Sequence, residues 1–139
     1  MLQLYNSEVI LDSNKEAFKM SIWQVDAVED FEEWWNDLSE AEQIEISAVV
    51  RLLREMGPML GFPYSSGISE SKFHNMRELR IQYRGKPYRV LYAFDPTRAA
   101  ILLVGGNKTG KDRWYKKHVP IADKLFRQHL KSLNKKTKR

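Results

Sequence analysis

The second half of this chain carries cationic, imidazole and phenol side chains that could together cleave RNA without a metal ion. A guanidinium binds a phosphate through two hydrogen bonds and stabilises the charge that develops when the neighbouring 2′-hydroxyl attacks it. A lysine, histidine or tyrosine can then move the protons, whereas an arginine is too basic to accept one at neutral pH. The candidates are Arg80, Arg89, Lys108, Lys111, Arg113, Tyr115, His74 and His118.

Other catalytic patterns are missing from the sequence. There is no HExxH motif, EF-hand loop, nucleophile elbow or convincing carboxylate pair, so we predict no metal and no cofactor. The chain has no cysteine, which excludes thiolate ligands, thiol nucleophiles and disulfides.

A glycine-rich stretch resembles the sequence motif of a nucleotide-binding loop. Residues 105–111 fit the pattern G-x-x-x-x-G-K between an expected strand and an expected helix. However, Asp112 stands where a magnesium-binding hydroxyl should be, and the expected strands lack crossover helices. We therefore favour a flexible loop that offers Lys108 and Lys111 to a polyanion.

Charge is divided unevenly along the chain. Residues 1–60 contain 4 Lys and Arg against 13 Asp and Glu, a net charge of −9, whereas residues 61–139 contain 19 against 5, a net charge of +14. A fold built from two such halves should have a positive face, and such faces most often meet nucleic acid, anionic membrane or an acidic protein. A solvated surface without a partner is the alternative.

The acidic half predicts a strand followed by two helices. We expect a strand at Ser21–Val25 and a helix that is capped by Asp26 and ends at Asp37, with an aromatic stripe packed in the core. Ser39 and Glu42 form a capping box for a second helix, which should end at Met56 before the Gly-Pro stop signal. Its expected inward residues are Ile44, Val49, Leu52, Leu53 and Met56.

The basic half predicts an antiparallel meander and a C-terminal helix. A long ordered loop is expected at residues 57–76. In the strand that follows, at residues 78–83, apolar and polar residues alternate, which predicts one apolar and one polar face. Turn residues at 84–87 and 95–98 then join it to strands at residues 88–94 and 99–104. Pro120 should lie in the first turn of the last helix, which carries the apolar set Ile121, Leu125, Phe126, Leu130 and Leu133. The expected fold class is α+β.

The domain boundaries follow from these elements. We expect an N-terminal extension at residues 1–19, one domain at residues 20–133 and a solvated, mobile basic tail at residues 134–139. No apolar run is long enough to span a membrane and the first 19 residues do not read as a signal peptide, so a cytoplasmic protein without a membrane partner is expected.

Two candidates have structural alternatives. Arg89 lies in an apolar strand and is costly to bury without an anion, so an ion pair with Glu78 or a helix carboxylate competes evenly with a phosphate-binding role. His74 adjoins the cationic set, although a single histidine is more often a surface or structural residue.

The segments ELRIQYRGKPYRVLYAFD, AILLVGGNKTGK and WYKKHVPIADKLFRQHL, in this order of elements, resemble the RelE/ParE toxins of type II toxin–antitoxin systems, and most closely the phage-associated HigB-like branch. The resemblance covers about residues 20–133. It implies a ribosome-dependent mRNA endonuclease that is inhibited by a helix-turn-helix antitoxin, HigA-like, encoded beside it.

The resemblance also implies roles for individual residues. Arg80 matches a basic residue of the first meander strand, Arg89 the arginine that contacts the scissile phosphate, and Lys108 lies near a loop arginine. Tyr115, with Trp114 as the alternative, lies near the C-terminal aromatic that stacks on or activates the substrate. The chain departs from RelE at Glu78, where a lysine is expected, and it departs from the HigB C-terminal His/Asp/Tyr pattern.

The predicted site therefore has two parts, and the residue that transfers the proton is left open between His74 and His118. The catalytic candidates are Arg80, Arg89, Lys108, Tyr115 and His74. The RNA-binding candidates are Lys72, Arg77, Lys111, Arg113 and His118. Two other functions compete with an mRNA endonuclease: a ParE-like inhibitor of DNA gyrase, and a non-enzymatic basic module that binds RNA or protein.

Overall fold

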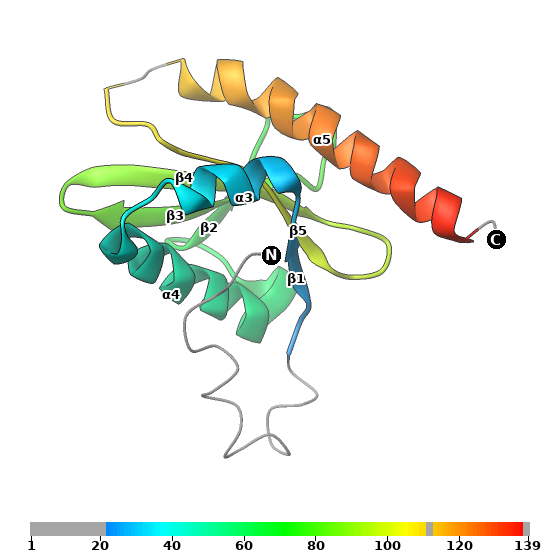
Figure 1. Ribbon diagram of the computed structural model, residues 1–139, viewed down its shortest axis with the longest axis horizontal. Coiled ribbons are helices and arrows are strands. Elements are labelled where there is room, and N and C mark those ends of the chain that lie inside the picture. The colour runs from blue at the N-terminus through cyan, green and yellow to red at the C-terminus, as the bar shows by residue number, and fades with distance from the viewer. Residues whose placement is uncertain (1–21, 111–112, 138–139) are drawn as a thin grey trace.

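One five-stranded sheet organises the fold, and the computed structural model describes it within residues 22–110 and 113–137 (Figure 1). Its strands are β1 (Val25–Ala27), β2 (Ser65–Gly67), β3 (Arg77–Tyr83), β4 (Lys86–Phe94) and β5 (Ala100–Asn107). They lie in the order β1-β5-β4-β3-β2, and each neighbouring pair is antiparallel except β1 with β5. The predicted meander of β3, β4 and β5 is confirmed.

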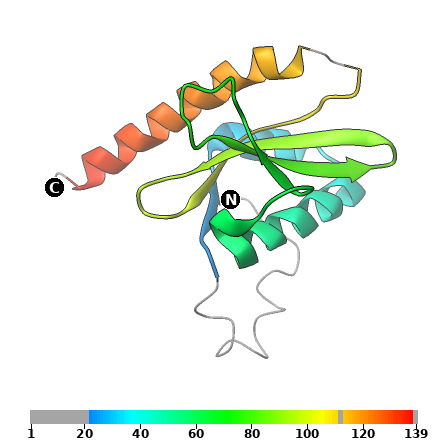
Figure 2. The same cartoon turned by 180° about the vertical axis from the view of Figure 1, so that it is seen from behind.

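Helices cover both faces of this sheet. The first face carries α3 (Glu29–Asn36) and α4 (Glu40–Met56), which is followed by the short 3-10 turn η2 (Gly57–Met59). The second face carries α5 (Trp114–Thr137), which crosses the sheet on the side opposite α4 (Figures 1 and 2). The expected α+β class is confirmed. Among the described helices, none has the length and apolar character needed to cross a membrane.

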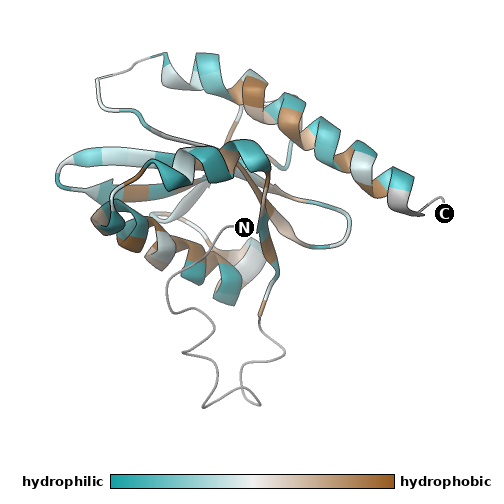
Figure 3. Cartoon of the chain, viewed as in Figure 1, coloured by the Kyte–Doolittle hydropathy of each residue, from teal (hydrophilic) through white to brown (hydrophobic). Residues whose placement is uncertain are grey.

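The strand alternation divides the apolar residues into two cores. Leu79 and Ile81 of β3 pack on the α3/α4 side, while Leu91 and Leu103 of the central strands pack on the α5 side. β4 and β5 are therefore buried on both faces, and the helices that cover them alternate apolar and polar residues along their length (Figure 3). On the α5 side, Glu78 of β3 and Arg89 of β4 are therefore buried rather than in open solvent.

The N-terminal elements begin later than predicted. β1 starts at Val25 and Asp26 pairs with Ile101 of β5, so Asp26 is committed to the sheet and cannot cap a helix. The N-cap of α3 is Val28, whose side chain makes no capping bond. The aromatic stripe is correctly placed, since Phe31 and Trp35 are buried in the core.

α4 confirms the capping box but shifts the buried face. The Ser39 side chain accepts a bond from the Glu42 N–H, and the Glu42 side chain accepts one from the Ser39 N–H. Val49 and Leu53 are buried as predicted, and Leu52 packs against the same core. The predicted inward residues Ile44 and Met56 are instead 48% and 45% exposed, and Ile46 and Val50 are buried in their place.

The connections around β3 show one predicted and one unpredicted feature. Arg84 and Gly85 both have positive φ, 50° and 74°, as a two-residue hairpin turn requires. The predicted loop at residues 57–76 contains η2 and the short strand β2. It is fastened to α5, because the Asp123 carboxylate accepts bonds from the Ser71 hydroxyl and the Lys72 N–H.

α5 is longer than predicted at both ends. It begins at Trp114, so Pro120 lies inside the helix and not in its first turn, and it continues to Thr137 through part of the predicted tail. Ile121 is 41% exposed, whereas Val119, Ala122 and Phe126 are buried. The predicted extension at residues 1–19 lies outside the described residues.

Candidate phosphate-binding site

A buried carboxylate lies at the centre of the cationic residues. Glu78 of β3 is 4% exposed, on the α5 side of the sheet. Its carboxylate accepts hydrogen bonds from the Tyr115 hydroxyl at 2.5 Å, the Ser66 hydroxyl at 2.7 Å and Arg80 at 3.0 Å. A carboxylate with this many donors is fixed in place.

Arg89 completes the cluster from the neighbouring strand. It is 7% exposed, and its Nε lies 3.4 Å from a Glu78 oxygen and donates to the Tyr115 hydroxyl at 3.2 Å. A second guanidinium nitrogen donates to the Tyr88 carbonyl at 3.0 Å. The ion pair with Glu78, one of the two predicted interpretations of Arg89, is therefore present.

The local sequence explains why these groups meet. Glu78 and Arg80 are two residues apart in β3 and share a face, and Arg80 is paired directly with Arg89 of β4. The first turn of α5 places Tyr115 over this pair. Lys108, just beyond β5, has its Nζ 5.6 Å from the centre of the Tyr115 ring. We call Glu78, Arg80, Arg89, Lys108 and Tyr115 the Glu78 cluster.

The Glu78 cluster carries surplus positive charge. It contains one carboxylate against two guanidiniums, which pair with that carboxylate, and the Lys108 ammonium, which lies over the Tyr115 ring. Burial, with the bond to Glu78 as the next cause, raises the pKa of Tyr115 above its usual value of 10.0, and the nearby Arg89 only partly opposes this. Tyr115 is therefore a hydrogen-bond donor at neutral pH and a poor proton acceptor, and the surplus cations can attract a phosphate.

Three predicted residues lie away from the Glu78 cluster. His74 is exposed in the loop before β3, and the adjacent Asn75 bonds to the Phe94 carbonyl at the far end of β4. Arg77 shares the face of Leu79 and donates to the Ser65 hydroxyl, so it lies on the other side of the sheet. Lys72 is exposed beside α5.

The remaining predicted residues lie around the start of α5. His118 stacks on Trp114 with 4.4 Å between ring centres and its Nδ1 is 2.8 Å from the Trp114 carbonyl, which ties this imidazole to its own helix. Arg113 is exposed immediately before α5. Lys111 lies outside the described residues.

The sequence reasoning missed two parts of the site. Glu78 appeared only as a departure from the RelE pattern and as one possible partner of Arg89, although it has more partners than any other group of the cluster. Ser66 belongs to a strand of three residues and carried no signal. The spacing of Glu78 and Arg80 in one strand did place both on one face.

The glycines of the apparent nucleotide loop have a packing role. Gly105 and Gly106 lie in β5, where they pair with Val90 and Arg89, so they form no phosphate loop. A Cβ at these positions would meet the rings of Trp34 at 2.2 Å and Trp114 at 2.6 Å. Only glycine lets both tryptophans approach the strand this closely.

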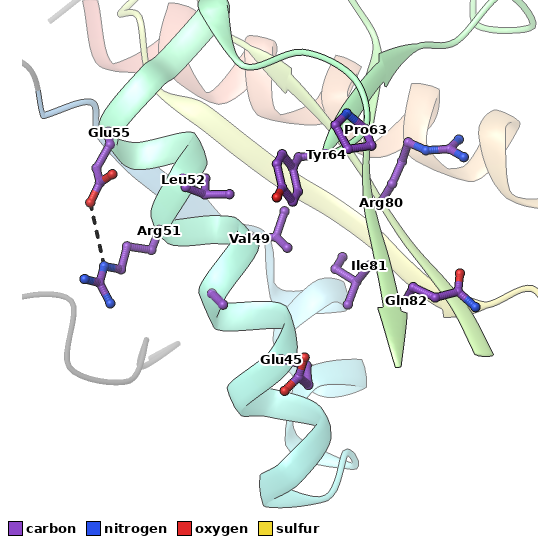
Figure 4. A pocket seen from close by; sticks show the side chains of 11 residues that line it. Glu45, Val49, Arg51, Leu52, Glu55, Pro63, Tyr64, Arg80, Ile81 and Gln82 are labelled. Atoms are coloured by element: carbon purple, nitrogen blue, oxygen red, sulfur yellow. Dashed lines mark ion pairs between the residues drawn. The ribbon is translucent and has the colours of Figure 1, made fainter. Parts of the chain in front are cut away.

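A concave surface adjoins the Glu78 cluster at Arg80. This groove, of about 610 Å³, lies between α4 and the edge of β3 (Figure 4). Val49, Leu52 and Ile81 give it an apolar floor, and Arg51 pairs with Glu55 on its α4 wall. Arg80 lines it from β3. Arg80 is the residue of this lining that also belongs to the Glu78 cluster, where cations, a phenol and a carboxylate are in contact. We therefore place the candidate site at the Glu78 cluster.

The sequence matches the family model described as phage derived protein Gp49-like (DUF891) over residues 33–127. The chain belongs to this family. A relative from Mycobacterium tuberculosis, assigned as toxin HigB3, is 42% identical over 102 residues, which are 73% of this chain and 88% of the relative. Another from that organism, assigned as toxin HigB2, is 39% identical over 110 residues, which are 78% of this chain and 54% of that relative.

A solved mutant of the Escherichia coli toxin RelE in the free state is also similar to this Gp49-like chain. It has 13% sequence identity and a TM-score of 0.49, and it covers 66% of this chain and 88% of its own. The HigB relatives confirm the expected HigB-like toxin family.

Proposed function

We propose that this protein is the toxin of a type II toxin–antitoxin pair and that it cleaves mRNA in the ribosomal A site through the neighbouring 2′-hydroxyl. The observation that carries this proposal is the Glu78 cluster, which gathers two arginines, a lysine, a tyrosine and a carboxylate on one sheet face. The HigB relatives support the toxin part of the proposal.

The arginines bind the scissile phosphate. Arg80 and Arg89 are cross-strand partners, so a phosphate can receive hydrogen bonds from both guanidiniums. In the free protein both are held by Glu78, which keeps them in place before the substrate arrives. As negative charge grows on the phosphoryl oxygens, these guanidiniums stabilise the transition state more than the ground state.

Glu78 is the proton acceptor that the geometry favours. Its carboxylate lies among the phosphate-binding groups, whereas Tyr115 has a raised pKa and His118 is tied to its own helix. The 2′-oxygen attacks phosphorus and its proton passes to Glu78, while the bond from phosphorus to the 5′-oxygen breaks. Lys108 supplies a proton to that oxygen, giving a 2′,3′-cyclic phosphate and a 5′-hydroxyl end.

A cognate antitoxin is the partner that a toxin of this family requires. We propose a helix-turn-helix antitoxin encoded beside it, and the ribosome with its mRNA as the second partner. The net charge of +14 in residues 61–139 favours association with ribosomal RNA and mRNA.

The test is inducible expression followed by mapping of RNA cleavage on ribosomes. Wild type should cut messages during growth arrest, and Arg89→Ala combined with Lys108→Ala should abolish cleavage. Lys124→Ala is the control, because Lys124 is an exposed cation of α5 outside the cluster. Intact messages during arrest, or full activity in the double variant, contradict the proposal. A supercoiling assay on the same extracts identifies a gyrase inhibitor.

A further inference from the structure

An exposed aromatic ring lies beside the Glu78 cluster. Phe62, between η2 and β2, is 76% exposed. Isolated apolar side chains are common on protein surfaces, so exposure alone indicates nothing. Its neighbour is the informative feature, since the guanidinium carbon of Arg80 lies 5.1 Å from the centre of the Phe62 ring.

Arg80 connects the ring to the proposed phosphate site. The same guanidinium bonds to Glu78 at 3.0 Å, and Arg80 is the cross-strand partner of Arg89. Figure 4 shows the Arg80 side chain directed away from α4, although Arg80 is among the residues that line the groove. One face of the Phe62 ring is thus turned to a cation of the site, while most of the side chain stays open to solvent.

We propose that Phe62 is a stacking platform for an unpaired RNA base next to the cleaved phosphate. Single-stranded bases stack on aromatic side chains, and arginine beside the ring adds attraction for the nucleotide. Such stacking tolerates any base but favours those with larger ring systems. The inference rests on the proposed ribonuclease function and assigns substrate binding to a residue outside the Glu78 cluster.

An apolar protein contact is the competing use of this ring. It would also engage Met59, which lies three residues earlier and is 82% exposed. Methionine offers no π face for a base, so Met59 is a matched control: both residues are exposed and apolar and lie in the same connection. The neighbouring cation favours RNA over an apolar protein surface.

The experiment measures ribosome-dependent cleavage of a short mRNA by Phe62→Leu, Phe62→Trp and Met59→Ala. Phe62→Leu should raise KM about tenfold with kcat nearly unchanged, Phe62→Trp should retain wild-type KM, and Met59→Ala should have no effect. A second set of mRNAs carries one abasic nucleotide at each position beside the cleaved bond. At one of these positions the missing base should raise the KM of wild type about tenfold, and it should not raise the KM of Phe62→Leu any further.

Two results overturn the inference separately from the proposed function. If wild type cleaves RNA and Phe62→Leu has the same KM, Phe62 has no stacking role, and the proposed ribonuclease function still stands. Loss of antitoxin affinity in both Phe62→Leu and Met59→Ala, with KM unchanged, reassigns the ring to a protein contact. If wild type does not cleave RNA at all, the proposed function and this inference fail together.

Discussion

Two buried carboxylates, Glu78 and Asp95, are each held by a side chain of α5, yet their surroundings differ. Glu78 meets Tyr115 at the start of the helix, and Asp95 meets His129, 14 residues later or roughly 21 Å along it. Both carboxyl groups accept several hydrogen bonds, so burial and bonding alone do not separate a structural carboxylate from a functional one.

The difference lies in the partners. Asp95 closes the turn between β4 and β5, accepting bonds from Thr97 and from the Ala99 N–H in addition to His129. Among the described residues, no arginine or lysine side chain bonds to the Asp95 carboxylate, so no surplus of such cations surrounds it. Glu78 is surrounded by more positive charge than it can neutralise. A buried carboxylate with surplus cations is therefore the better candidate for phosphate chemistry.

Glu78→Gln should have the largest effect. The amide keeps the size of the side chain but cannot accept a proton, so ribosome-dependent cleavage should fall about 100-fold or more. The cleavage rate measures this, and a thermal melt checks that the variant is folded. Wild-type cleavage by a folded Glu78→Gln protein would remove Glu78 from the mechanism.

Asp95→Asn should lower the stability of the fold and leave the cleavage rate unchanged. The amide loses the charge-assisted bond to His129 and disturbs the bonds to the turn, so we expect the free energy of unfolding to fall by about 2 kcal/mol. Urea denaturation measures the loss. Cleavage by the folded fraction should stay at the wild-type level, and a drop as large as that of Glu78→Gln would erase the distinction between the two carboxylates.

Tyr115→Phe should have an intermediate effect on activity. It removes the 2.5 Å bond to Glu78 while keeping the ring that faces Lys108, so the carboxylate loses a fixing contact. Cleavage should fall about tenfold, which corresponds to about 1.4 kcal/mol of transition-state stabilisation. A loss as large as that of Glu78→Gln would make Tyr115 a direct participant.

The smallest predicted effect is a pH dependence of stability at Asp95. Burial alone would raise the pKa of Asp95, but bonds from His129 and Thr97 outweigh it and the pKa lies below the usual 3.8. Because the pKa is lower in the folded protein than in the unfolded chain, the ionised carboxyl stabilises the fold fully at pH values above about 3.8. This stabilisation is lost as the pH falls from about 3.8 through the lower pKa of the folded protein. Urea midpoints at pH 5 and pH 3 should therefore differ less for Asp95→Asn than for wild type, whereas equal differences contradict this role.

Local patterns predicted much of the fold. The alternation around Leu79 and Ile81, the turn at Arg84 and Gly85, and the Ser39 capping box each depend on residues close in sequence, and all are confirmed. β2 could not be predicted, because Ser65–Gly67 is too short to show a period and pairs only through contact with β3.

The sequence predicted the cationic and aromatic residues of the candidate site, but it did not predict that the Glu78 carboxylate lies at their centre. Arg80, Arg89, Lys108 and Tyr115 lie together in the structure, while the roles that the resemblance implied for them stay predictions. In the sequence, Glu78 belongs to the polar alternation of its strand, which indicates a solvent-facing side chain. Its burial depends on α5 crossing that face from 36 or more residues away, and no local pattern reports such a contact.

The chemical identity of the RNA ends tests the central claim most directly. Purified wild-type protein should be incubated with programmed ribosomes, and both new ends of the cut message analysed. A 2′,3′-cyclic phosphate on one fragment and a 5′-hydroxyl on the other are the result predicted for attack by the neighbouring 2′-hydroxyl at the Glu78 cluster. A 5′-phosphate with a free 3′-hydroxyl would require attack by water and would contradict the account.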